Sequence, residues 1–247
     1  MKKYFPTMHS HPQSSLVVSI VSYWGWAFVL VPWWLPFMSM GLWENQKYAS
    51  WLQIGYYTLN GLVTAGILKN YLKDEWFMIT TAPGYYLGHS AVTVGLMVSS
   101  VILQMGFFRA LGGDISYVFA GLPVTEMFVT QTSGFMVRSN PVFATVCTAL
   151  VSPVCVCGLF YAVGFAPLGC KRPWLAYICT AVVTLIPVVV DIIWRGNFVF
   201  MMDVYFLRLP IHLLACWSYQ KTDNIFTPMF SLSVMNLLGA LANIFLQ

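Results

Sequence analysis

The sequence predicts an all-α protein, a polytopic membrane helical bundle with about eight transmembrane spans (7–8). Hydrophobic residues make up 59% of the 247 residues and charged residues only 8%, and the mean hydropathy is +0.73. A soluble domain carries roughly 25% charged residues, so this chain cannot cover a water-facing surface. Several apolar runs reach the ~20 residues that a helix needs to cross a bilayer. The ~10-residue alternating segments of a transmembrane barrel are missing from the sequence.

Each predicted span is an apolar run bounded by charged or turn-forming residues. The spans are 16–40, 51–68, 85–108, 116–137, 142–168, 175–194, 198–219 and 225–246. Short linkers hold most of the charge: 44–47, 69–75, 109–114, 138–141, 171–173, 195–197 and 220–224. A polar tail, 1–15, precedes the first span. No linker is long enough for a soluble domain, so residues 1–247 are interpreted as a single transmembrane domain.

The loop charges predict an integral, multi-pass membrane protein and its orientation. With the N-terminus inside, six Lys and Arg residues lie on that side and five on the other, a small excess that favours this topology. The cations are spread over short loops and form no basic patch suited to nucleic acid. The expected partners are therefore membrane lipids and other membrane-protein subunits, with no nucleic acid. No internal repeat is seen, which disfavours a transporter built from duplicated halves.

Charged side chains inside spans are the first candidates for a functional site, because a charge at mid-membrane costs ~2.5–3.5 kcal/mol on insertion scales. They are Glu126, Asp191, Asp203, Arg208 and His212. Arg208 and His212 are four residues apart and share one helix face, whereas Asp203 lies off that face. This polar cluster would line a cavity or a partner interface, or it would form structural ion pairs and snorkel to the membrane surface. For Glu126, a packed neutral carboxyl and a proton-handling acid are both open.

No metal site, cofactor or catalytic motif is expected. The sequence lacks His-Glu-x-x-His and Gly-x-Ser-x-Gly, and its four histidines are too few and too scattered for a His-rich metal site. The pair Cys155 and Cys157 has neither metal-finger spacing nor a second pair. The six cysteines are interpreted as small buried hydrophobic residues.

One C-terminal segment resembles a known family. Residues 219–228 read Tyr-Gln-Lys-Thr-Asp-Asn-Ile-Phe-Thr-Pro, and Asn236 follows. This pattern resembles the last motif of the CAAX-protease and bacteriocin-processing (CPBP, or Abi) membrane family, in which a Lys-Thr-Asp/Gly-Asn turn caps two helices and the next span carries His-x-x-x-Asn. The resemblance in spacing covers residues 150–240, interpreted as a CPBP-like core. It implies that Asn236 belongs with the candidate polar cluster.

The catalytic positions of that family carry apolar residues in this chain. The histidine four residues before Asn236 falls on Leu232. The stretch after Pro153 resembles the first motif, but its Glu pair falls on Val156 and Cys157 and its Arg on Tyr161. The middle Phe-x-x-x-His motif would fall at 184–188, where neither residue is found. The resemblance therefore implies a degenerate member that has lost the glutamates and histidines with which the family activates water.

Two other alignments are open. Pro123-Val-Thr-Glu126 also resembles the first CPBP motif, with Gln131 at the arginine position. The TRAM-LAG-CLN8 (TLC) lipid-handling domain is a second resemblance, based on Glu126 and on the charged loop 73–77. The paired histidines of that domain would fall on Thr80 and Thr81.

The leading hypothesis is a catalytically inactive CPBP-like membrane protein that acts as a scaffold, an immunity-type factor or an accessory subunit of a membrane complex. One alternative is an intramembrane peptidase of altered chemistry that uses Glu126 and His212 across a cavity. The other is a small-molecule or lipid transporter or binding protein, in which Asp203, Arg208 and His212 line a polar path.

Overall fold

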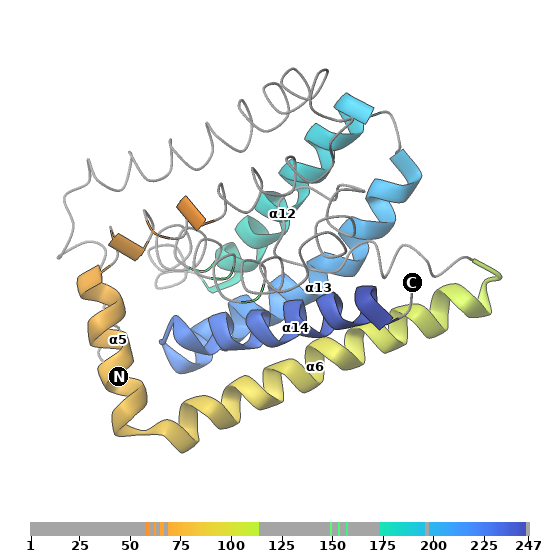
Figure 1. The fold of residues 1–247 in the computed structure, drawn as a ribbon. Coiled ribbons are helices and arrows are strands. Elements are labelled where there is room, and N and C mark those ends of the chain that lie inside the picture. The colour runs from red at the N-terminus through yellow and green to blue at the C-terminus, as the bar shows by residue number, and fades with distance from the viewer. Residues whose placement is uncertain are drawn as a thin grey trace.

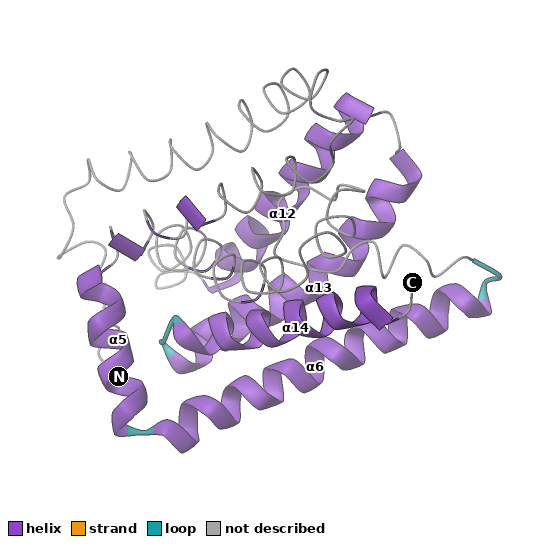
Figure 2. Cartoon of the chain, in the orientation of Figure 1, coloured by secondary structure: helices purple, strands orange, loops and turns teal. Residues whose placement is uncertain are grey.

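The computed structural model describes residues 58–59, 62, 65–66, 69–113, 149, 153, 157, 173–195 and 198–245. All regular secondary structure in these ranges is helical (Figures 1 and 2), so the all-α prediction is confirmed for the described part of the chain. The helices are α5 (Lys69–Thr81), α6 (Pro83–Ala110), α12 (Pro173–Arg195), α13 (Phe198–Thr222) and α14 (Phe226–Phe245).

The predicted spans 85–108, 175–194, 198–219 and 225–246 coincide with α6, α12, α13 and α14. The spans 16–40 and 116–137 lie outside the described residues, and so do nearly all of 51–68 and 142–168.

The interpretation of residues 69–75 as a linker is wrong, because they form the first half of α5. Charge was taken to indicate a loop, but residues 69–81 contain neither Gly nor Pro, and Lys, Leu and Glu are good helix formers. Leu72, Glu75 and Ile79 follow one another at helical spacing on the inner face. Ile79 and Glu75 are buried, and Leu72 packs against the hydrophobic core.

Both ends of α6 are defined by backbone chemistry. Pro83 is the first helical residue, and the residue before it, Ala82, leaves the helical conformation with φ −138° and ψ 59°, as residues before proline do. At the other end Gly112 has φ +74°. The Gly112 N–H donates to the Arg109 carbonyl (3.0 Å) and the Gly113 N–H to the Phe108 carbonyl (2.9 Å). These two bonds form a Schellman motif, which needs glycine at the left-handed position.

The helix α13 is the centre of the described bundle. It contacts α12 on one side and both α6 and α14 on the other, and α6 and α14 also contact each other. Figure 1 shows α5 standing at a steep angle to α6, next to the turn that joins α13 to α14. The buried apolar side chains form one cluster, the apolar cluster: Met97, Val101, Cys157, Ala176, Leu207, Ile211, Ala215, Cys216, Tyr219, Ile225, Met229, Leu232 and Met235.

Among the described helices, α6 is the one long and apolar enough to cross a membrane by its length and composition, and residues 226–242 form a shorter apolar helix. The core helix of a soluble protein would be mostly buried, but only 17% of the most apolar 18-residue stretch of α6 is buried. Large apolar side chains such as Ile102, Leu103 and Phe107 are more than half exposed. These exposed side chains favour a lipid environment along α6, since water would oppose such a surface.

Candidate functional site: the polar cluster at the turn between α13 and α14

The end of α13 is a left-handed turn made without glycine. Asp223 has φ 52°, a conformation that Asp and Asn tolerate better than other side chains. Its N–H donates to the Tyr219 carbonyl (2.8 Å), which closes the last turn of the helix. The Tyr85 hydroxyl of α6 lies 3.4 Å from the Lys221 carbonyl and donates to another orphan acceptor of this helix end. The turn is therefore tied to α6 as well as to its own helix.

Asn224 caps the start of α14. Its Oδ1 accepts from the Phe226 N–H (2.9 Å), which is the N-cap arrangement. Pro228 has no N–H to donate to the Asn224 carbonyl, and the Thr222 hydroxyl lies 3.4 Å from that oxygen. The same hydroxyl lies 2.9 Å from the Ser218 carbonyl, so its single proton serves either acceptor. The sequence-based prediction that this segment caps two helices is confirmed.

Glu75 is the residue that joins α5 to this turn. It is 1% exposed, and its Oε2 accepts from the Ile225 N–H (3.3 Å) at the start of α14. In return, the Asn224 side-chain amide donates to the Glu75 backbone carbonyl (3.0 Å). The role of Glu75 in joining α5 to the turn was not predicted from the sequence, because its charge was taken to indicate a loop. The available signal was the helical spacing of Leu72, Glu75 and Ile79, which places the carboxyl on an apolar face.

Burial dominates the titration of Glu75. The pKa of the carboxyl is raised from 4.5 to about 8, mainly by burial and to a smaller extent by the nearby carboxylates Asp223 and Asp74, against the lowering effect of the Ile225 N–H. Removal from water disfavours the charged form, and a single backbone donor compensates only in part. Close to neutral pH this side chain therefore exists in both protonation states.

Small polar side chains connect α6 to α14 next to the turn. The Ser90 hydroxyl donates to the Thr227 carbonyl (3.2 Å), and the Ser231 hydroxyl lies 3.3 Å from the Ser90 carbonyl. All three residues are buried. Small side chains let two helix backbones approach closely. The residues of this turn cluster are Glu75, Tyr85, Ser90, Thr222, Asp223, Asn224, Thr227 and Ser231.

The structure places part of the predicted polar cluster inside the bundle. Arg208 and His212 are both buried on α13, at 7% and 6% exposure, and Asn236 is fully buried on α14. Asp191 and Asp203 lie on α12 and α13, where their backbone alone is described. Glu126 lies outside the described residues, so its predicted pairing with His212 stays a prediction.

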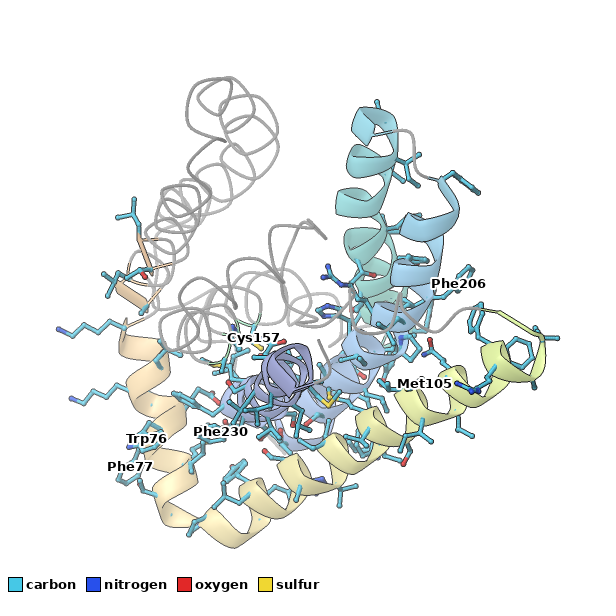
Figure 3. All side chains as sticks on the ribbon, turned by 45° about the vertical axis from the view of Figure 1, so that its right-hand side comes forward. Trp76, Phe77, Met105, Cys157, Phe206 and Phe230 are labelled. Atoms are coloured by element: carbon cyan, nitrogen blue, oxygen red, sulfur yellow. The ribbon has the colours of Figure 1, made fainter. Side chains whose placement is uncertain are left out.

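Two of the positions at which the CPBP resemblance places catalytic side chains, Cys157 and Leu232, lie in the apolar cluster. Cys157 and Leu232 both have no exposed surface and belong to this one cluster. Figure 3 shows Cys157 beside α14. Residue 156, the other half of the glutamate pair, is outside the described residues. Two positions 75 residues apart in the sequence thus share one interior region.

The chemistry open to the described residues is narrow. They contain no group of three or more His, Cys, Asp or Glu side chains able to hold a metal ion. In the turn cluster, the carboxyl of Glu75 can gain and lose a proton, and the hydroxyls can only donate and accept hydrogen bonds. The arrangement joins helices and contains one carboxyl, Glu75, whose pKa is raised by burial.

Comparison with models of protein families, with curated proteins and with solved structures gives no match to this chain.

Proposed function

We propose that this chain is a catalytically inactive, CPBP-like integral membrane protein with a binding role. In this proposal it spans the bilayer several times, with about eight spans, and acts as a scaffold, an immunity-type factor or an accessory subunit of a membrane complex. Membrane lipids and other membrane-protein subunits are its partners.

One observation carries the proposal. The positions matching a catalytic glutamate and a catalytic histidine, Cys157 and Leu232, are buried in the same apolar cluster. Peptide hydrolysis needs a base or a metal to activate water, and a thiol beside an isobutyl group supplies neither. A scaffold that keeps its packing and fills the reactive centre with apolar side chains fits a binding protein.

The exposed surface supports the membrane part of the proposal. On α12, Trp174, Ile178, Val182, Val189 and Ile193 are all exposed, and they recur at spacings of four and seven residues along one helix. With the exposed side chains of α6, they provide apolar surface of the kind that lipid or a neighbouring membrane helix covers. Few charges and short loops fit a subunit that meets its partners within the bilayer.

The decisive experiment is a peptidase assay on the full chain in lipid nanodiscs. Quenched fluorescent peptides, both prenylated and unmodified, are incubated with the wild type and with a Glu126→Gln variant. An active CPBP protease in the same nanodiscs is the positive control. We expect no cleavage above the empty-disc rate for either protein. Cleavage by the wild type that is lost in Glu126→Gln would establish an enzyme and end the proposal.

A second experiment tests the arrangement on which the proposal depends. In a variant that keeps Cys157 as its only cysteine, Leu232→Cys is introduced and a short bismaleimide is added. We expect an intramolecular cross-link between the two thiols. The matched control is Leu238→Cys on the same helix, where the native side chain is 44% exposed. Equal cross-linking at 232 and 238 would remove the support from the shared interior.

A further inference from the structure

We propose that α5 is a latch on the bundle, held on the turn between α13 and α14 by the neutral carboxyl of Glu75 and released when that carboxyl ionises. The proposal rests on the contacts of α5 and holds whether or not the chain is a CPBP-like binding protein.

The latch is a small, specific contact. Glu75 accepts from the Ile225 N–H (3.3 Å) through Oε2 and from the Asn224 amide (3.0 Å) through its backbone carbonyl. Next to them the rings of Trp76 and Phe226 meet edge to face, with centroids 5.4 Å apart. The outer face of α5 carries exposed Lys69, Lys73 and Asp74. The buried Ile79 and the packed Leu72 add apolar contacts along the same face of α5, and Glu75 is the titratable group within this contact.

The helical conformation is interrupted between α5 and α6, and this interruption allows α5 to move as a unit. Ala82 separates α5 from α6 with a non-helical conformation, and Pro83 removes the N–H that would continue the helix through this point. Only local bonds cross the junction, such as the Ala82 N–H to the Met78 carbonyl (3.2 Å). Figure 1 shows that α5 turns away from α6 immediately before the junction. Residue 82 is thus the hinge position at which two rigid helices meet.

The charges around Glu75 oppose its ionisation. Asp74 acts from its own helix and Asp223 from the turn. An ionised Glu75 would be a third carboxylate beside two others, in a site with 1% exposure. Swinging α5 out returns that charge to water, which is the physical reason for release.

The direction of the pH effect follows from the pKa. Docking raises the pKa of Glu75 from 4.5 to about 8, so the docked state binds a proton more tightly than the undocked state. Docking is strongest below pH 4.5 and weakens as the pH rises through 8. Between pH 6 and pH 9 the docking equilibrium constant falls by a factor on the order of 10 to 100.

The test measures the position of α5 directly. Spin labels are placed at Lys69→Cys on α5 and Lys221→Cys at the end of α13, both exposed, in a full-length protein whose six native cysteines are replaced by alanine. Distances are recorded by pulsed electron paramagnetic resonance in nanodiscs from pH 6 to pH 9. We expect one short, narrow distance at pH 6 and a longer, broader distribution at pH 9, with most of the change complete by pH 8 and the midpoint below it.

Three variants separate the latch from a general effect of pH. Glu75→Gln keeps an acceptor for the Ile225 N–H but cannot ionise, and it should stay docked at both pH values. Asp223→Asn tolerates the left-handed conformation and removes the stronger of the two neighbouring carboxylates, so docking should persist to higher pH and its midpoint should shift upward. Asp74→Asn, the matched control, should shift it less.

Two results would overturn the latch. The first is a wild-type distance that does not change between pH 6 and pH 9, and the second is a Glu75→Gln protein that responds to pH as the wild type does. If Glu75→Gln fails to fold, the pH titration of the wild type and the midpoint of Asp223→Asn still test the latch. A midpoint that does not move in Asp223→Asn contradicts the proposed charge set.

Discussion

The turn cluster and the apolar cluster hold the same helices together by different means. The turn cluster uses directional bonds, such as Asn224 to Glu75 (3.0 Å) and Ser90 to Thr227 (3.2 Å). The apolar cluster uses close packing, with Leu207, Ile211 and Leu232 fully buried. Hydrogen bonds fix which residues meet, because a buried donor or acceptor without a partner costs about 1–3 kcal/mol. Packing supplies more stability and less specificity.

This contrast bears on function. The CPBP resemblance implies polar catalytic groups at positions 157 and 232 of a working hydrolase. In this protein the described interior is apolar at both positions, and a titratable carboxyl lies instead at the helix junction, on Glu75. The buried carboxyl of Glu75 thus lies where α5 meets the turn between α13 and α14, whereas the buried Arg208, His212 and Asn236 lie within α13 and α14.

The largest expected effect comes from the apolar cluster. Leu232→Ala should lower the free energy of unfolding by about 3 kcal/mol, because a fully buried Leu leaves a cavity when it is truncated. Thermal unfolding in a non-ionic detergent measures this change. The matched control is Leu238→Ala on the same helix, whose side chain is 44% exposed, and it should change stability by less than about 0.5 kcal/mol. Equal losses in the two variants would contradict the proposed packing of α14.

Glu75 should make the stability of the protein depend on pH. Its pKa is raised from 4.5 to about 8 in the folded state, so the folded state binds more protons than the unfolded state in this window. The free energy of unfolding should fall by roughly 2 kcal/mol from pH 6 to pH 8. Thermal unfolding across this range measures it. Glu75→Gln should lose this part of the pH dependence, and a wild-type stability that rises over the same range would show that the sign is wrong.

Asn224 should contribute less than Leu232 but more than any single serine. Asn224→Ala removes the cap on the Phe226 N–H and the donor to Glu75, with an expected loss of about 1.5 kcal/mol. Asn224→Asp keeps the cap acceptor but adds a carboxylate beside Glu75, so its loss should be larger at pH 8 than at pH 6. Thermal unfolding at the two pH values separates the lost cap from the added charge. An Asp variant insensitive to pH would show that Glu75 does not respond to this position.

The sequence was sufficient to predict the strongly apolar helices, but it did not predict α5, which mixes charged and apolar residues. Apolar runs predicted α6, α12, α13 and α14 within a few residues, because burial and membrane insertion both depend on hydrophobic length. The helix α5 was missed because its charges suggested a loop, whereas its inner face of Leu72 and Ile79 follows the helical period. The position of α5 could not be predicted, since it depends on a carboxyl bonded to a helix 150 residues away.

The candidate site was predicted in part. The turn at 223–224 was expected from the resemblance of residues 219–228 to a family motif, and its capping bonds join residues that are near in sequence. Arg208, His212 and Asn236 were predicted to lie in apolar helices, and all three are buried on α13 and α14. The importance of Glu75 was not foreseen, because burial of a single carboxyl is decided by tertiary packing that the sequence does not display.

The smallest expected effect comes from the hydrogen bond between α6 and α14. Ser90→Ala removes the bond to the Thr227 carbonyl (3.2 Å) and should lower the free energy of unfolding by about 0.6 kcal/mol, the average for such bonds between membrane helices. The control is Ser99→Ala on the same helix, whose hydroxyl bonds only within α6, to the Gly95 carbonyl (2.8 Å), and which should be nearly neutral. A Ser90→Ala loss above about 2 kcal/mol would exceed the strongest bonds of this type. Such a loss would mean that directional bonds also supply much of the stability, and the division of roles between the two clusters would then have to be abandoned.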